Sequence, residues 1–198
     1  MSDAKQRILS RLAEFRRNDV ELPTPLATPT VYDDRLAQFR SVLEMVGGQL
    51  IVTRDANETR QAIERLEVVR DARRVLSYCP DLMASAEGLD EIHDPHDLAD
   101  VDVTVAPGEF GVAENGAVWV CDPAIMHRVS LFLSQHLVLV IASGELFNNM
   151  HEAYHHIGRV DSPFGGFISG PSKTADIEQS LVIGAHGARS LNVVLVDR

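Results

Sequence analysis

The sequence predicts an α/β fold built around a mostly parallel sheet. Segments with a helical period alternate with short apolar runs along most of the chain, which is the pattern of repeated strand–helix units. The apolar runs are continuous, as in strands that are buried on both faces. The 198 residues are enough for one sizeable domain that needs neither disulfides nor a structural metal.

The chain divides into an N-terminal helical extension with its linker, residues 1–30, and an α/β domain, residues 31–198. An amphipathic helix is expected over residues 3–17, and three prolines within residues 22–29 mark an extended linker. The first half of the domain is expected to alternate helix and strand: a helix at 31–46, a strand at 49–53, a helix at 56–69 and a strand at 74–78. An irregular acidic stretch at 84–100 follows, and then a strand at 101–106, a glycine-rich turn and a strand at 117–121. The last part is expected to contain a helix at 123–133, a strand at 137–142, an amphipathic segment at 144–158 and a strand at 191–196.

Composition excludes several classes of function. The formal charge is −11 and there is no basic run, so nucleic acid is not an expected partner. Cys79 and Cys121 lie far apart inside apolar runs, as reduced thiols of a cytoplasmic protein do. They are also too few for an all-thiolate iron–sulfur cluster within this chain. The longest apolar run, 137–142, is too short to cross a membrane, and we see no signal peptide.

One motif, His151-Glu152-x-x-His155, is typical of zinc peptidases. Two histidines one helical turn apart can bind one metal ion, with the glutamate as base for a bound water, and Gly158 and Asp161 extend the match. However, every methionine precedes Asp161, so the methionine turn of that protease class is missing. Gly158 also suits the left-handed position after a helix. We expect solvated histidines and no bound metal, and keep the zinc peptidase as a remote alternative.

A first polar loop covers residues 106–117. Its glycines, among them Gly111 and Gly116, let the backbone approach a ligand and expose amide N–H groups, which bind anions without a basic side chain. Glu114 in such a loop can act as nucleophile or base when it is partly desolvated. The alternative is a tight turn between two strands, because Asn115-Gly116 is a strong hairpin signal. Spacing alone favours the turn.

A second polar loop covers residues 169–178. Its composition predicts a strand leading into a short helix capped by Ser172 or Thr174, with Asp176 and Glu178 in the first turn. A carboxylate or phosphate could dock on the free N–H groups there, beside Lys173. The Walker pattern is absent, so this is not a P-loop. The two carboxylates alternatively serve only the helix dipole. In parallel sheets ligands bind at the carboxyl ends of strands, where we expect both loops.

Three segments resemble the LutC/YkgG-type lactate-utilisation family, the LUD domain. They read Gly-Val-Ala-Glu-Asn-Gly at 111–116, Ser-Gly-Pro-Ser-Lys-Thr-Ala-Asp-Ile-Glu at 169–178 and Gly-Ala-His-Gly-Ala-Arg-Ser-Leu-Asn from 184, continuing into the last strand. The second and third are long and specific. Asn115 departs from the family's usual Thr, and Ala188 from the Pro that commonly follows His-Gly. The resemblance covers roughly residues 45–198.

The resemblance implies a three-layer fold of the NagB/RpiA/CoA-transferase-like type. It also implies a subunit or accessory protein of a system that oxidises L-lactate to pyruvate, with iron–sulfur clusters in partner subunits and none bound by this chain. We expect a small anionic ligand between the two loops. The alternative is a stand-alone enzyme of CoA-transferase or cyclo-ligase-like fold that uses Glu114. The expected ligand-binding residues are Gly111, Asn115, Gly116, Ser169, Gly170, Ser172, Lys173, Thr174, Asp176, Glu178 and His186.

Overall fold

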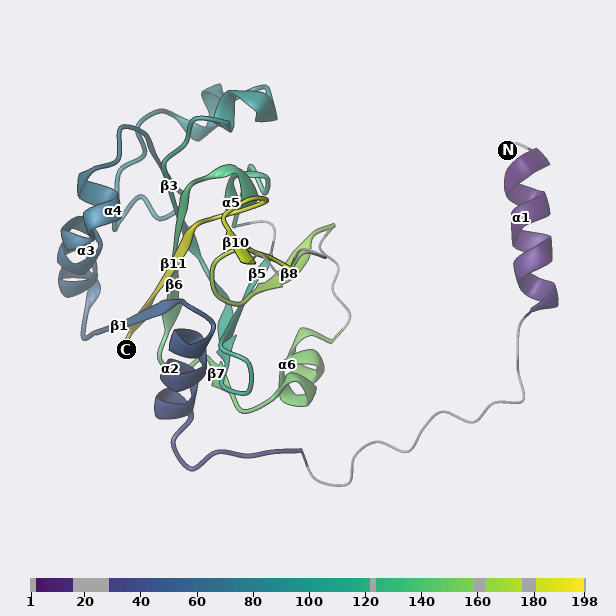
Figure 1. Ribbon diagram of the computed structural model, residues 1–198, viewed down its shortest axis with the longest axis horizontal. Helices are drawn as coiled ribbons and strands as arrows, with labels where there is room; N and C mark the ends of the chain where they lie inside the picture. The colour runs from purple at the N-terminus through teal and green to yellow at the C-terminus, as the bar shows by residue number, and fades with distance from the viewer. Residues whose placement is uncertain (1–2, 16–28, 122–123, 159–162, 176–180, 198) are drawn as a thin grey trace.

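A five-stranded sheet, parallel throughout, forms the centre of the fold (Figure 1). Its strands, in spatial order, are β1 (Gln49–Thr53), β11 (Ser190–Val196), β6 (His136–Ala142), β3 (Val103–Pro107) and β2 (Val75–Ser77). The structure is a computed structural model, and it describes residues 3–15, 29–121, 124–158, 163–175 and 181–197. The sequence prediction of a mostly parallel sheet is confirmed.

The central sheet is buried on both faces, which gives the three layers. Helices α3 (Ala56–Arg65) and α4 (Glu67–Arg70) cover one face, where Ile63 packs on valines of β3, β6 and β11. Helices α2 (Arg35–Met45) and α5 (Ser130–Leu133) and a second sheet cover the other face. Alternate residues of each strand point to opposite faces. This explains why the strands read as continuous apolar runs.

The second sheet was not anticipated. It has the order β7 (Leu146–Phe147), β4 (Phe110–Val112), β5 (Ala117–Cys121) and β8 (Gly165–Ile168). The expected glycine-rich turn therefore contains strand β4, which pairs antiparallel with β5. A strand of three residues with a central glycine gives too little local signal to be recognised. Helix α6 (Met150–Ile157) follows β7. One residue from each strand of the second sheet joins an aromatic cluster: Phe110, Trp119, Phe147 and Phe167.

Several expected helices are shorter than predicted or divided. The helix expected at 56–69 is divided into α3 and α4 at Leu66, whose backbone is extended. In the helix expected at 123–133, of which the structure describes residues 124–133, only Ser130–Leu133 form an α-helix, α5. Helix α6 begins at Met150 because the Asn149 side chain accepts a hydrogen bond from the Glu152 N–H and so caps the helix.

The acidic stretch contains two short 3-10 helices, η1 (Leu89–Glu91) and η2 (Pro95–Leu98). Arg74 ties this stretch to the entry of β2 through hydrogen bonds with the side chains of Glu87 and Asp100. These carboxylates, Glu87 most, raise the pKa of Arg74.

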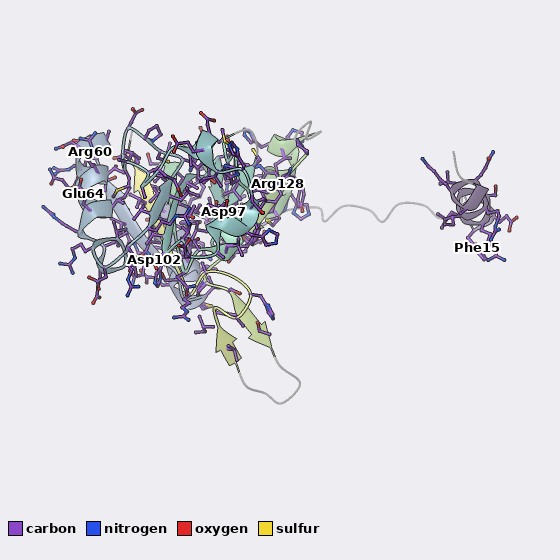
Figure 2. All side chains as sticks on the ribbon, turned by 90° about the horizontal axis from the view of Figure 1, so that it is seen from above. Phe15, Arg60, Glu64, Asp97, Asp102 and Arg128 are labelled. Atoms are coloured by element: carbon purple, nitrogen blue, oxygen red, sulfur yellow. The ribbon has the colours of Figure 1, made fainter. Side chains whose placement is uncertain are left out.

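The prediction of a helix after Ser172 is wrong for the residues that the structure describes. Strands β9 (Lys173–Ala175) and β10 (Leu181–Ile183) instead form an antiparallel hairpin. Figure 2 shows this hairpin projecting from the rest of the domain. The capping residues are a local signal for a helix. They could not reveal the hairpin, because β9 pairs with β-branched residues further along the chain. Asp176 and Glu178 lie outside the described residues.

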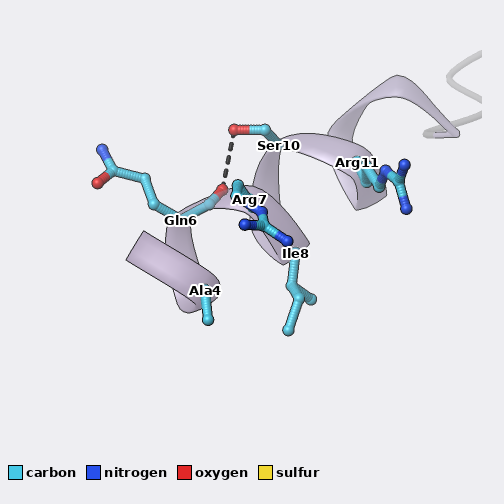
Figure 3. A pocket seen from close by; sticks show the side chains of 6 residues that line it. All are labelled: Ala4, Gln6, Arg7, Ile8, Ser10 and Arg11. Atoms are coloured by element: carbon cyan, nitrogen blue, oxygen red, sulfur yellow. Dashed lines mark hydrogen bonds between the residues drawn. The ribbon is translucent and has the colours of Figure 1, made fainter. Parts of the chain in front are cut away.

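Helix α1 (Asp3–Glu14) keeps its apolar face uncovered. Ile8, Leu9 and Leu12 are each more than half exposed, and Figure 1 shows the helix apart from the domain. Figure 3 shows six side chains around a hollow, all from this one helix. A hollow beside a single helix has no opposite wall, so we do not regard it as a ligand site. Most of the expected linker, 22–29, lies outside the described residues. Among the helices that the structure describes, none has the length and apolar character needed to span a membrane.

Candidate functional site

A hollow of about 240 Å³ lies between residues 169–172 and residues 186–188. Its walls are mostly apolar, and its polar side chains lie on the two loops. The lining residues are Leu131, Phe132, Leu137, Phe167, Ile168, Ser169, Gly170, Pro171, Ser172, His186, Gly187, Ala188 and Leu191. Leu137 and Leu191 are the second residues of β6 and β11. The hollow therefore lies toward the amino ends of these strands, whereas we expected the loop at the carboxyl ends.

Backbone hydrogen bonds fix the two loops that border the hollow. The Ser172 N–H donates to the Ala188 carbonyl at 2.8 Å, and the Gly184 N–H donates to the Ser172 carbonyl at 2.9 Å. Gly170 has φ +71°, and a Cβ there would lie 2.6 Å from the carbonyl oxygen of Val46. Only glycine fits this turn against the end of α2. The loop is thus held on both sides.

The two predicted polar loops meet at one hydrogen bond. The Ser169 hydroxyl donates to the Asn115 carbonyl at 2.8 Å. Of the predicted ligand-binding residues, Ser169, Gly170, Ser172 and His186 line the hollow. The others that the structure describes have different surroundings.

Glu114 caps helix α6. Its Oε2 accepts a hydrogen bond from the Met150 N–H at 2.8 Å, and its own N–H donates to the Asn148 carbonyl at 3.0 Å. The side chain is exposed and is not among the residues that line the hollow. A carboxylate at a helix N-terminus satisfies a free N–H and the helix dipole. This geometry gives Glu114 a structural role and no desolvated environment for a nucleophile or base.

The first loop is a hairpin turn, not an anion nest. Asn115 Oδ1 accepts from the Ala117 N–H at 3.2 Å, and Gly116 has φ +62° at the turn. The N–H groups of Gly111, Ala113 and Gly116 donate to the carbonyls of Glu145, Phe147 and Val112. Amides that are already paired cannot bind an anion. The tight-turn interpretation is confirmed, and the nest is wrong.

Lys173 and Thr174 belong to strand β9 and are not among the lining residues. The Lys173 side chain reaches toward Gly47, just after α2. A cation is stabilising there because it faces the negative end of the helix dipole. Thr174 pairs with Val182 across the hairpin. Their expected role beside a helix N-terminus has no basis in the described structure.

In the zinc-peptidase motif, the carboxylate of the glutamate already accepts hydrogen bonds. The Glu152 carboxylate accepts from the backbone N–H of Asn148 at 2.8 Å and from the Asn148 side-chain amide at 3.0 Å. The Glu152 N–H in turn donates to the side chain of Asn149, the N-cap residue, so Glu152 takes part in the start of helix α6. His151 and His155 are exposed. Within the described part of the chain, no three His, Cys, Asp or Glu side chains are grouped as metal ligands. Asp161 lies outside it.

A second hollow, of about 320 Å³, lies at the carboxyl ends of β3, β6 and β11. Cys79 and Glu109 are among its lining residues. Burial, with a smaller contribution from Asp81, raises the pKa of the Cys79 thiol to about 11. Cys121 donates to Glu109 at 3.8 Å. A protonated thiol is a poor metal ligand and a poor nucleophile.

His136, at the start of β6, predicts a dependence of stability on pH. Burial and, to a smaller extent, Arg189 lower its pKa, with Asp102 opposing. The unfolded chain therefore takes up a proton first as the pH falls, and stability is lost below about pH 6.5. Urea denaturation at pH 7.5 and 5.5 should show a smaller loss for His136→Gln than for the unaltered protein. An equal loss in both would contradict this.

The apolar residues of the hollow were missed at the level of sequence. Phe132 and Phe167 lie in segments that read as an ordinary helix and an apolar segment beside the polar loop. The available signal was their position next to the polar blocks. Phe132 is 48% exposed despite its size, which becomes visible only in the fold.

Comparisons with known proteins agree with this fold. Residues 86–196, more than half of the chain, match the LUD domain. Lactate utilization protein C of Shouchella clausii is 35% identical over 107 residues, which cover 51% of this chain and 45% of that protein. The protein of the same name from Anoxybacillus flavithermus is 28% identical over 176 residues, 85% of this chain and 75% of that protein.

The matched segment thus covers less than half of the Shouchella protein. Among solved structures, a DUF162 family protein from Deinococcus radiodurans has a TM-score of 0.64 at 18% identity, covering 85% of this chain and 99% of that one. This likeness supports the α/β fold. The match over residues 86–196 leads to a further conclusion: the chain belongs to the LUD domain family.

Proposed function

We propose that this chain takes part in lactate utilisation, as a ligand-binding component of a system that oxidises L-lactate to pyruvate. The observation that carries the proposal is the family match, together with relatives named Lactate utilization protein C. The hollow beside residues 169–172 is the proposed ligand site, because it combines a concave apolar wall with a few convergent polar groups.

The proposal assigns electron transfer to partner subunits. Oxidation of lactate to pyruvate releases two electrons and two protons, so an acceptor is required. Two cysteines within these 198 residues are too few for an all-thiolate iron–sulfur cluster. One of them, Cys79, has a raised pKa and stays protonated. We therefore place the iron–sulfur clusters in partner subunits, with this chain as a component rather than a complete catalyst.

The hollow offers the expected small anion hydrogen-bonding groups but no described cationic side chain. Ser169, Ser172 and His186 offer hydrogen-bonding groups at the hollow, but its described lining residues include no Lys or Arg. An anion that leaves water without a cation or several N–H donors loses solvation free energy. The small anion therefore stays a prediction.

A gene deletion tests the proposed function. A strain lacking the gene should fail to grow on L-lactate as sole carbon source and should grow normally on pyruvate. The reintroduced gene should restore growth, and the affinity-tagged protein should co-purify with an iron–sulfur protein. Normal growth of the deletion strain on L-lactate, without such co-purification, would contradict the proposal.

Glu114→Gln separates the component from a stand-alone enzyme. The glutamine carbonyl can still accept from the Met150 N–H, so we expect a loss of about 0.3–1 kcal/mol of stability from the missing charge at the helix N-terminus. The variant should restore growth on L-lactate in the deletion strain. If it is folded but does not restore growth, Glu114 takes part in the chemistry and the stand-alone enzyme gains support.

A further inference from the structure

The hollow beside residues 169–172 is lined mainly by carbon. Its aromatic and aliphatic residues come from α5, from β8 and from the first residues of strands β6 and β11. None of its described lining residues is Lys, Arg, Asp or Glu. Without a countercharge, an ionic group inside such a hollow would lose hydration and gain little in return. An uncharged ligand body therefore suits it best.

We propose that this hollow binds an uncharged planar ring with hydrogen-bonding atoms along one edge. The inference rests on the hollow being the ligand site of the proposed function, and it replaces the small anion by a ring. Aromatic faces attract flat rings by stacking, beyond the effect of the area they bury. Quinones, flavins and purines share this chemistry.

Phe132 provides one wall. It lines the hollow and is 48% exposed, although a large apolar ring loses free energy when it faces water. Its ring meets Phe164 edge to face, with 6.4 Å between the centroids. A ring stacked on Phe132 would cover this exposed apolar surface.

Phe167 borders the same hollow from β8, but its ring packs in the aromatic cluster, on the other face of β8 from Ile168. Its centroid lies 4.7 Å from that of Trp119 and 6.1 Å from that of Phe110. The aromatic surface on which the proposed ring stacks is therefore that of Phe132.

The groups that would pair with the hydrogen-bonding edge of the ring come from the two loops that border the hollow. The Ser172 hydroxyl and the His186 ring belong to residues that line the hollow, and the Ser172 backbone is fixed by two hydrogen bonds. The Ser169 hydroxyl donates to Asn115 and keeps its lone pairs free to accept. These groups can pair with carbonyl oxygens or ring nitrogens at the edge of a planar ligand. The polar groups orient the ligand, while the apolar lining supplies contact area.

Calorimetric titration of the purified full chain tests the inference. The probes are 2-methyl-1,4-naphthoquinone, lumiflavin and adenine, with sodium L-lactate as the small-anion probe. We expect at least one ring to bind, and the ring that binds identifies the source. Phe132→Ala should weaken binding roughly tenfold, as expected for the loss of one stacking partner. Phe132→Leu, which keeps apolar bulk, should weaken it less.

Leu133→Ala is the matched control. Leu133 is the next residue of α5, is 37% exposed and does not line the hollow. It should leave binding within about twofold, which corresponds to roughly 0.4 kcal/mol. The inference is overturned if none of the three rings binds at roughly millimolar concentration, or if Phe132→Ala and Leu133→Ala have equal effects. It is also overturned if L-lactate binds and Phe132→Ala does not alter that binding. Because these measurements need no growth phenotype, their failure is distinguishable from failure of the proposed function.

Discussion

Gly116→Ala should lower the free energy of unfolding by about 3 kcal/mol. Gly116 has φ +62°, a conformation that costs an alanine about 1–2 kcal/mol. A Cβ there would also lie 2.8 Å from the backbone nitrogen of Leu43 in α2, and backbone cannot move aside as a flexible side chain can. Urea denaturation followed by circular dichroism measures the effect.

Gly144→Ala is the control for this substitution. Gly144 is exposed and a Cβ there would meet nothing within 4 Å, so we expect a change of less than about 0.5 kcal/mol. If Gly116→Ala is as stable as the unaltered protein, the turn does not depend on close packing against α2. The expected ligand role of Gly116 would then have to be considered again.

Phe110→Ala should lower the free energy of unfolding by about 4 kcal/mol. Phe110 is 1% exposed and lies at the centre of the aromatic cluster. Its ring centroid is 5.0 Å from that of Phe147, 6.1 Å from that of Phe167 and 6.3 Å from that of Trp119. Removing it leaves a cavity that these rings cannot fill completely. It should also loosen Phe167, whose ring packs in the same cluster.

Tyr154→Ala tests whether position in the cluster, and not aromatic character alone, decides the effect. Tyr154 contacts Phe167 at 5.8 Å but is 61% exposed. We expect a loss of less than about 1 kcal/mol, because little buried area is removed. Similar losses for both variants would show that Phe110 is not the centre of this cluster.

The central sheet was predictable because its signal is local. Strand β1 was predicted with the bounds that the structure has, and so was β5 of the second sheet, since each has an apolar run at its centre. Assigning β5 to the second sheet was beyond the sequence, because its partners β4 and β8 are short and contain glycines. The β9–β10 hairpin was missed for a related reason. Its pairing is non-local, while the capping residues at 172–174 gave a strong local signal for a helix.

The site was predicted in part. Ser169, Ser172 and His186 came from long polar blocks, and they line the hollow. Gly111 and Gly116 were ambiguous because glycines suit both a nest and a tight turn. What decides between a nest and a turn is whether the amides are paired. Gly111 N–H donates to Glu145, Ala113 N–H to Phe147 and Gly116 N–H to Val112. No spacing rule within the loop could reveal acceptors that come from the β6–β7 connection and β7.

The central claim is that this hollow serves lactate utilisation, and complementation tests it most directly. The deletion strain would receive the unaltered gene, Phe132→Ala or Leu133→Ala, with protein levels matched, and growth on L-lactate would be measured. The account predicts growth with the unaltered gene and with Leu133→Ala, and strongly impaired growth with Phe132→Ala. Equal growth with Phe132→Ala and the unaltered gene would contradict it.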